Sequence, residues 1–321
     1  MKPEHDLPGQ LIAVGLAQPG LEEEPWKYGT LLNALDICGY HDWLRQIVVG
    51  FKDREPFILE NNIADCVARI RALVKCGFDA EAKRATDEFL AKRIDIDGVT
   101  EHAQARPTRN WLWIDSAYMV PPSMALVGQD AIAISDLLGL YRHLVAPNGL
   151  VRHLKQAIAV RPDERLVGAT EWIDGSAWGR GNGWFVAGSI DTIDFLAKPD
   201  PTVVQNYIQV CDALMRYRDE FGTWRSIIDD PESPAEMSGT AMIIYAFLKG
   251  HRMGLLPLVY REAALRALDR LMSAHFTWST LEVRDQQYGP MIMNVATRTS
   301  HQAGLSYGQA FLAMSLHGLW A

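Results

Sequence analysis

The stretch Ala34-Leu35-Asp36-Ile37-Cys38-Gly39-Tyr40 is echoed 38 residues later by Ala72-Leu73-Val74-Lys75-Cys76-Gly77-Phe78. In each copy an apolar helix is expected to end at the glycine, which takes up the left-handed conformation of a helix C-cap at little cost. A second helix is expected to follow each glycine. A weak repeat of this length, built from paired helices, is typical of stacked or ring-closed helical hairpins.

The helical pattern continues along the chain: apolar residues recur at three- and four-residue spacing, and the two-residue alternation of strands is scarce. Segments that are apolar on nearly all sides belong inside a fold, and one-sided segments belong outside. The expected inner helices are 26–38, 61–76, 116–127, 183–197, 237–253 and 303–320. The expected outer helices are 41–51, 79–93, 130–145, 201–219 and 257–275, with 9–17 as the segment that would close the ring. The sequence therefore predicts an all-α fold, an (α/α)6 barrel, with residues 1–321 forming a single catalytic domain.

Composition excludes several classes of protein. The net charge of −8 argues against nucleic-acid binding, and no run of about 18 apolar residues could cross a membrane. The four cysteines are scattered without a CxxC pair, and the N-terminus lacks a secretory pattern. We therefore expect free thiols, a cytoplasmic location and no structural metal site.

Longer connections precede the expected inner helices, and they carry the unusual residues. If all hairpins run the same way, these connections meet at one rim of the barrel, where function is commonly found. The rim residues are Trp26 and Tyr28; Glu60, Asn61 and Asn62; Trp111, Trp113 and Asp115; His153; Trp178 to Trp184; Trp224, Asp229, Asp230 and Glu236; and His301.

The most informative of these connections is Trp178-Gly179-Arg180-Gly181-Asn182-Gly183-Trp184, in which two indoles bracket one guanidinium. The glycines predict a loop that enters an apolar helix starting near Phe185, where backbone N–H groups favour anions. An acidic sugar suits this pattern, because its ring stacks on indole and its carboxylate pairs with guanidinium. The alternative is a structural turn with a core tryptophan on each side.

Two residues could carry chemistry. Asp115 lies within an apolar, aromatic run, where burial would raise its pKa and keep it protonated near neutral pH; the alternative is an ordinary helix N-cap. His153 could donate to a carboxylate or hydroxyl, or it could be a core histidine with its hydrogen bonds satisfied or a surface histidine.

Two other motifs do not indicate chemistry. The acidic stretch Asp229 to Glu236 has the composition of a solvated loop, and Gly304 to Gly308 matches GxSxG in a helical context that does not suit a nucleophile elbow.

Three motifs together resemble the unsaturated rhamnogalacturonyl hydrolases (glycoside hydrolase family 105), which are related to the unsaturated glucuronyl hydrolases of family 88. They are Trp113 to Met119, Trp178 to Trp184, and the stretch from Gly222 through Asp229-Asp230-Pro231 to Met242. The resemblance implies an (α/α)6 barrel that acts on oligosaccharides with a 4,5-unsaturated uronic acid at the non-reducing end, such as an unsaturated rhamnogalacturonan disaccharide. No cofactor, no metal, and no nucleic-acid or membrane partner is expected from the sequence.

By the same resemblance, Asp115 would protonate C4 of the double bond and help water to attack C5, giving a hemiketal that opens and releases the remaining sugar. One carboxyl group that shuttles a proton is enough for this hydration, so the paired carboxylates of ordinary glycosidases are not required.

Substrate binding is assigned by motif. Trp178 and Trp184 would stack on sugars, Arg180 would support binding, and His153 and Tyr28 match a family histidine and a family aromatic residue. The residues flanking His153 depart from the family pattern.

The family also has an aspartate that opens the second inner helix, and Asn61 aligns with it here. Either Glu60 replaces that carboxylate or the amide of Asn61 suffices. A sugar epimerase and a non-catalytic oligosaccharide-binding protein remain alternatives. The sequence determines neither the sugar after the uronate nor the oligomeric state.

Overall fold

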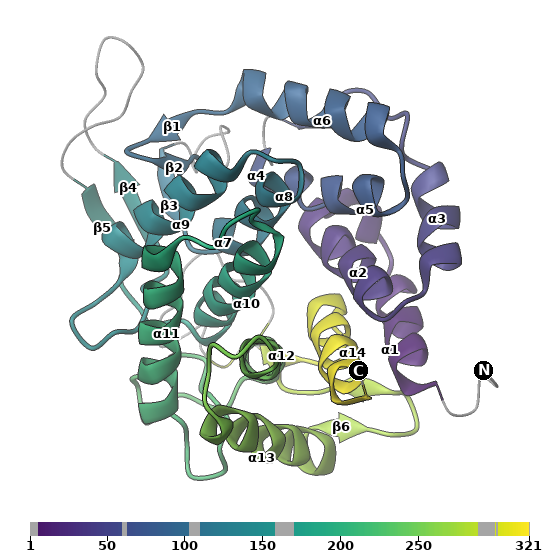
Figure 1. Ribbon diagram of the computed structural model, residues 1–321. Helices are drawn as coiled ribbons and strands as arrows, with labels where there is room; N and C mark the ends of the chain where they lie inside the picture. The colour runs from purple at the N-terminus through teal and green to yellow at the C-terminus, as the bar shows by residue number, and fades with distance from the viewer. Residues whose placement is uncertain are drawn as a thin grey trace.

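A computed structural model describes residues 6–59, 63–102, 110–157, 170–287, 299 and 301–320. Its helices form an inner ring surrounded by outer helices (Figure 1). The inner helices are α2 (Pro25–Ile37), α4 (Ile63–Val67) with α5 (Ile70–Lys75), α7 (Ser116–Met119) with α8 (Pro121–Leu126), α10 (Gly179–Phe195), α12 (Met237–Arg252) and α14 (Ser306–Trp320). The outer helices are α1 (Leu7–Leu16), α3 (His41–Val49), α6 (Asp79–Lys92), α9 (Asp130–Leu144), α11 (Pro201–Arg216) and α13 (Leu258–Ala274).

Contacts between neighbouring elements close the inner ring. Helix α2 touches α4 and α5, α4 touches α7, α7 and α8 touch α10, α10 touches α12, α12 touches α14, and α14 returns to α2. Helix α1 packs on α14 and α2, so the N-terminal segment closes the outer ring as expected. The predicted (α/α)6 barrel is confirmed.

The helix ends follow the glycine repeat. Gly39 and Gly77 have φ values of +79° and +72°, the left-handed region that a glycine enters without a Cβ clash. Just before them, the backbone N–H groups of Cys38 and Cys76 donate to Ala34 and Ala72 and complete the last turn. The repeat thus marks two helix ends correctly.

Two predicted inner helices are each broken in two. The predicted helix 61–76 is split between α4 and α5, and the predicted helix 116–127 is split at Val120. The second break has a clear cause, because Pro121 and Pro122 lack the N–H groups that a continuous helix would use. Within the described residues, no helix is long and apolar enough to cross a membrane.

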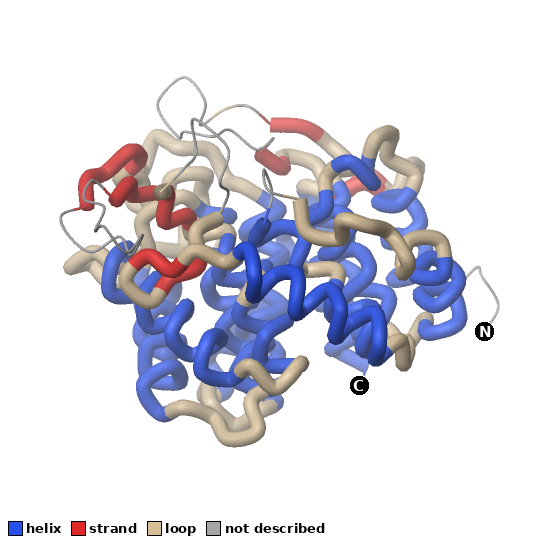
Figure 2. Tube along the Cα trace, turned by 90° about the horizontal axis from the view of Figure 1, so that it is seen from above, coloured by secondary structure: helices blue, strands red, loops and turns tan. Residues whose placement is uncertain are grey.

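Short strands, which the sequence patterns did not predict, lie mainly at one end of the barrel (Figure 2). They pair antiparallel as β1 (Asp95–Ile96) with β2 (Val99–Thr100), as a β3–β4–β5 sheet, as β6 (Phe276–Thr277) with β7 (Glu282–Val283), and as β8 (Gln286–Gln287) with β9 (His301–Gln302). The three-stranded sheet contains β3 (Trp111–Trp113), β4 (Leu154–Ala157) and β5 (Thr170–Asp174). Strands this short carry too few residues for a two-residue alternation to be recognised.

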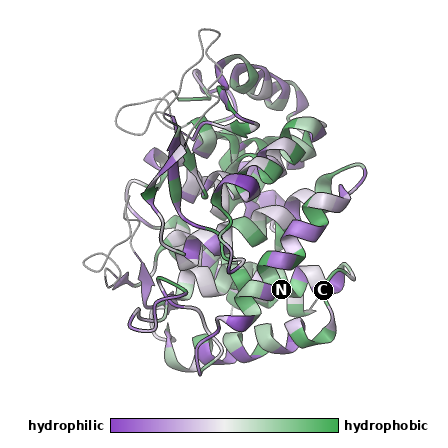
Figure 3. Ribbon diagram, turned by 90° about the vertical axis from the view of Figure 1, so that its left-hand side faces the viewer, coloured by the Kyte–Doolittle hydropathy of each residue, from purple (hydrophilic) through white to green (hydrophobic). Residues whose placement is uncertain are grey.

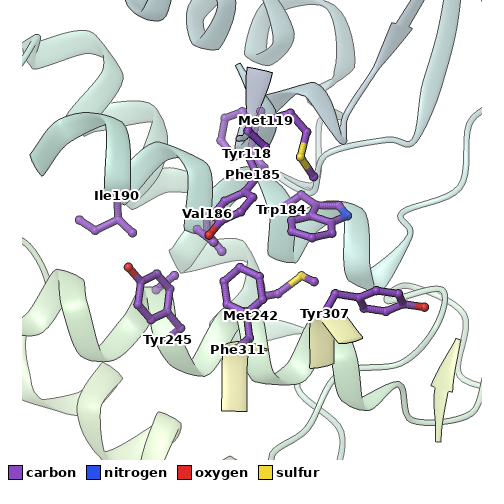
Figure 4. Packing of buried hydrophobic residues seen from close by; sticks show 14 of the residues in the cluster. Tyr118, Met119, Trp184, Phe185, Val186, Ile190, Met242, Tyr245, Tyr307 and Phe311 are labelled. Atoms are coloured by element: carbon purple, nitrogen blue, oxygen red, sulfur yellow. The ribbon is translucent and has the colours of Figure 1, made fainter. Parts of the chain in front are cut away.

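Hydrophobic residues line long stretches of the helices, whereas many strand and loop residues are hydrophilic (Figure 3). Helix α10 runs through this core, since every residue from Gly179 to Ile193 is buried. Tyr118, Tyr245 and Phe311 from neighbouring helices gather around it (Figure 4).

Helix α10 depends on a glycine for its closest backbone contact. A Cβ placed on Gly188 would lie 1.9 Å from the carbonyl oxygen of Ala117, on α7. Because both partners are backbone, neither could move aside as a side chain does. This contact holds α7, and the residue that precedes it, against α10.

We expect Gly188→Ala to lower the free energy of unfolding by about 2 kcal/mol, since the new methyl group forces the two helices apart. Urea unfolding followed by circular dichroism measures this change. Gly318→Ala is the matched control: its Cβ would meet nothing closer than 3.7 Å on α14 and should add about 0.5–1 kcal/mol through helix propensity. Equal effects of the two substitutions would contradict the close-contact argument.

Candidate active site

The glycine-rich segment is the first turn of a helix and not the loop expected from its sequence. Trp178 is the N-cap residue, and α10 begins at Gly179. The N–H of Gly179 donates to the carbonyl of Ser226 at 2.9 Å, and a Cβ on Gly179 would lie 2.3 Å from the carbonyl oxygen of Arg225. The first glycine therefore serves a close backbone crossing, which side-chain patterns alone do not reveal.

A cavity of about 180 Å³ lies at this end of the barrel. Its lining comes from α2, α4, α7, α10 and the segments that precede α7 and α10. The lining residues are Glu24, Trp26, Lys27, Asp65, His102, Trp113, Asp115, Met119, Trp178 and Arg180. Asp115, Trp178 and Arg180, which are far apart in sequence, thus face one space.

Asp115 occupies the N-cap position of α7 without acting as a cap. Its backbone is helical, its side chain makes no capping hydrogen bond, and its Oδ2 has no hydrogen-bond partner in the described part of the chain. Burial raises the pKa of the Asp115 carboxyl, while His153, Arg180 and the neighbouring Trp184 indole oppose the shift. A carboxyl group with a raised pKa and a free oxygen can hold and give a proton.

A second carboxyl group, which sequence analysis missed, lines the same cavity. Asp65 lies on α4, and its pKa is raised well above the ordinary value by burial and then by the charges of Asp115 and Glu24. Two carboxyl groups that interact in this way titrate as a pair and hold one proton between them over a range of pH.

His102 also escaped the sequence analysis. Burial lowers its pKa to about 4, so its ring is neutral near pH 7. Its Nδ1 lies 2.9 Å from the Ser116 hydroxyl and its Nε2 lies 3.5 Å from Oδ1 of Asp65. A neutral ring leaves the charge on Asp65 uncompensated, which fits the raised pKa of that carboxyl.

Glu60 and Asn61 lie outside the described residues, so their places at the site stay predictions. Asp65 supplies a carboxyl group in this region that the choice between the Glu60 carboxylate and the Asn61 amide did not include. The available signal was the one used for Asp115: an acidic residue inside an apolar run, here Ile63-Ala64-Asp65-Cys66-Val67.

Arg180 and Trp178 are both held by one residue of β8. The Trp178 indole donates to Oε1 of Gln287 at 2.7 Å, and Arg180 donates to the Gln287 carbonyl. The backbone N–H of Gln287 donates in turn to Glu236 at 3.0 Å, and Glu236 caps α12. The guanidinium also stacks over Trp178 at 4.2 Å, and its Nε has no hydrogen-bond partner among the described residues. Its orientation is thus fixed while one donor remains available.

Trp184 lies in the core and does not line the cavity, so the expectation that it stacks on sugar does not fit its position. It is fully buried, with Tyr118 and Phe311 against its ring at centroid distances of 5.1 and 5.7 Å (Figure 4). Trp26, which is partly exposed and lines the cavity, stacks on Tyr307 at 5.1 Å and is the better placed indole. Helical periodicity explains why Trp178 lines the cavity and Trp184 does not. Trp184 lies six residues after the N-cap residue Trp178, and at that position the side chain points into the core.

His153 is also fully buried and lies outside the cavity lining. The indole N–H of Trp113 donates to its Nε2 at 2.9 Å, so Nδ1 carries the proton and donates to Asp174 at 2.7 Å. Both ring nitrogens are occupied, which corrects the expectation that His153 contacts substrate. The chain Asp174–His153–Trp113 instead fixes an indole that lines the cavity.

Tyr28 is likewise placed elsewhere, since it lines a neighbouring larger cavity.

The acidic stretch Asp229 to Glu236 is structural: Asp229 pairs with Arg152 at 2.8 Å, and Glu236 caps α12. Within the described residues, no group of three or more histidine, cysteine or acidic side chains is arranged to hold a metal ion.

The Asp174–His153–Trp113 chain predicts the effect of Asp174→Asn. Asp174 accepts from both His153 and the Ser176 N–H, whereas asparagine offers one oxygen and one NH₂ group. We expect the His153 proton to move to Nε2, which would break the bond to Trp113 and cost about 1–3 kcal/mol of stability. Nitrogen-15 NMR of the His153 ring and the Trp113 indole reports the change, and an unaltered histidine tautomer would contradict the assignment.

The fold is shared with solved glycoside hydrolases. A family 105 enzyme from C. acetobutylicum ATCC 824 matches with a TM-score of 0.76 and 19% identity, over 98% of this chain and 99% of that one. A possible family 105 member from Salmonella enterica serovar Paratyphi A gives 0.76 and 20%, over 98% and 92%. The unsaturated glucuronyl hydrolase from Bacillus sp. GL1 gives 0.71 and 16%, over 91% and 85%.

A curated sequence relative is the unsaturated rhamnogalacturonyl hydrolase YesR of Bacillus subtilis, 30% identical over 88 residues. That match spans 26% of this chain and 26% of the relative. The model of Glycosyl Hydrolase Family 88 matches residues 61–314, which include Asp65, Asp115 and the Trp178 to Trp184 segment. The protein therefore belongs to Glycosyl Hydrolase Family 88.

Proposed function

We propose that this protein hydrolyses oligosaccharides that carry a 4,5-unsaturated uronic acid at the non-reducing end, such as unsaturated rhamnogalacturonan disaccharide. The observation that carries the proposal is the meeting of Asp115, Trp178 and Arg180 in one cavity. A carboxyl that holds a proton, an indole face and a guanidinium are the groups that this substrate requires.

Asp115 gives its proton to C4 of the vinyl ether, and the positive charge that develops at C5 is stabilised by the resulting carboxylate. Water then adds to C5 and returns a proton to Asp115, so the carboxyl group is regenerated. The product is a hemiketal at C5, which opens and releases the remaining sugar. The raised pKa of Asp115 suits the first step, because the carboxyl must be protonated before it can donate.

Arg180 pairs with the uronate carboxylate through its Nε, which no described residue contacts by a hydrogen bond, while Trp178 and Trp26 border the sugar. Lys27, bonded to Glu24 at 2.7 Å, adds a second cation to the cavity wall. Because Glu24 offsets the charge of Lys27, Arg180 is the cation that we propose for the substrate carboxylate, against a net charge of −8.

Asp65 keeps a proton available beside Asp115, since the two carboxyls do not ionise together readily. The four cysteines, which are free and buried, support a reducing location such as the cytoplasm.

Asp115→Asn should abolish turnover and retain binding, because the amide has no proton to give but keeps the shape of the side chain. The conjugated double bond absorbs in the ultraviolet, so turnover of lyase-generated disaccharides is followed as loss of absorbance. Calorimetry with the same disaccharide measures binding. A wild-type protein that binds the unsaturated sugar without consuming its chromophore would refute the proposed activity.

Asp65→Asn should move the alkaline limb of kcat/KM to lower pH. In the wild-type protein, the carboxyl pair keeps a proton until the pH exceeds its upper pKa, which is raised by burial and by like charge. With asparagine at position 65, Asp115 alone must hold the proton and loses it at lower pH. A pH–rate profile over pH 4–9 (about the range in which carboxyl and histidine groups titrate) tests this shift. A lower rate with an unshifted limb would contradict the shared proton.

A further inference from the structure

A second and larger cavity, of about 940 Å³, lies beside the first at the start of α2. Its walls come from α1, the η2 turn (Leu21–Glu23), α2, α3 and the segment between α3 and α4. The charged residues of the lining are two arginines, Arg54 and Arg69, and one acidic residue, Glu23. Two aromatic rings, Tyr28 and Trp43, line it as well. None of these residues takes part in the chemistry proposed above.

Arg69 is the group that needs an explanation. Its side chain is 2% exposed, Nη2 donates to the Phe57 carbonyl at 2.8 Å, and Nε has no hydrogen-bond partner among the described residues. The guanidinium lies over the Phe57 ring at 4.7 Å, and no carboxylate of the described chain pairs with it. Enclosing a cation without an anion is costly, so the position favours an anionic ligand.

The electrostatics at Arg69 also favour an anionic ligand. Burial lowers the pKa of Arg69, the neighbouring Cys66 thiol opposes that effect, and the like charge of Arg54 adds to it. A ligand carboxylate at this cavity would reduce the repulsion that Arg54 exerts on the buried Arg69. Tyr28 and the partly buried Trp43 supply ring faces of the kind that border sugars.

The two cavities are separated by a single turn of chain. Glu23, Pro25 and Tyr28 line the larger cavity, and the intervening Glu24, Trp26 and Lys27 line the smaller one. On the next inner helical segment, Asp65 faces the smaller cavity and Arg69, four residues later, lines the larger one. A chain of sugars that leaves the first cavity across the start of α2 therefore meets the second.

We propose that the larger cavity is a distal subsite for a second carboxylate-bearing sugar of the same oligosaccharide, with Arg69 and Arg54 as its cations and Tyr28 and Trp43 as its bordering rings. The inference rests on the proposed function, because it assigns the unsaturated end to the smaller cavity. The protein would then favour longer acidic oligosaccharides over disaccharides with one carboxylate.

The test compares two unsaturated tetrasaccharides of equal length, one with a carboxylate on an interior sugar and one with that carboxylate reduced to an alcohol. An unsaturated disaccharide is the third substrate. Loss of the ultraviolet chromophore gives kcat/KM for each. We expect the wild-type protein to prefer the acidic tetrasaccharide about tenfold over its reduced counterpart, the effect of one charge-assisted hydrogen bond.

Arg54→Gln changes an exposed residue and should remove most of that preference while leaving disaccharide turnover unchanged. Arg69→Gln should do the same, and Arg69→Lys, which keeps the charge, should retain part of it. Arg261→Gln, an exposed arginine on α13, is the matched control and should change nothing.

Equal kcat/KM for the acidic and reduced tetrasaccharides would overturn the distal subsite, as would a preference that survives both Arg54→Gln and Arg69→Gln. Failure of the proposed function has a different signature, since the wild-type protein would then consume none of the three chromophores.

Discussion

The site depends on how closely the backbone of α10 approaches its neighbours. At Gly188 the helix touches the Ala117 carbonyl of α7, and at Gly179 it touches the Arg225 carbonyl. A Cβ at either position would clash with these backbone oxygen atoms, because it would lie much closer to them than a van der Waals contact allows. The same helix carries Arg180 in its first turn, and α7 directly follows Asp115. Close packing along α10 therefore sets the distance between the carboxyl and the guanidinium.

A second layer of polar contacts keeps the cation in place. Glu236 caps α12 and holds the backbone N–H of Gln287, whose carbonyl accepts from Arg180 and from the Tyr307 hydroxyl. Each of these groups is buried, so each would be costly to leave unsatisfied. The network thus makes the orientation of the guanidinium a property of four separate elements: α10, α12, α14 and β8.

Burial of charge gives the cavity its chemical character. Asp65 and Asp115 are enclosed together beside a neutral His102, so proton retention is the least costly way to reduce their repulsion. Trp113 contributes an apolar wall, and its ring is held by His153 and Asp174. Desolvation and rigid hydrogen bonding act together here, because a protonated carboxyl is useful only if its position is fixed.

The sequence by itself determined the helical hairpins, their alternation between inner and outer layers, and two helix ends, because these depend on local periodicity and on glycine conformation. It also singled out Asp115, since a carboxyl in an apolar run needs a reason that can be seen locally. Only the tertiary structure decided which side chains face the cavity. Trp184 and His153 turned into the core, Trp26 and Asp65 turned toward the cavity, and the glycine-rich segment became a helix. Those outcomes depend on the rotation of each helix and on contacts between residues more than a hundred positions apart, such as Trp178 with Gln287, which short-range patterns do not encode.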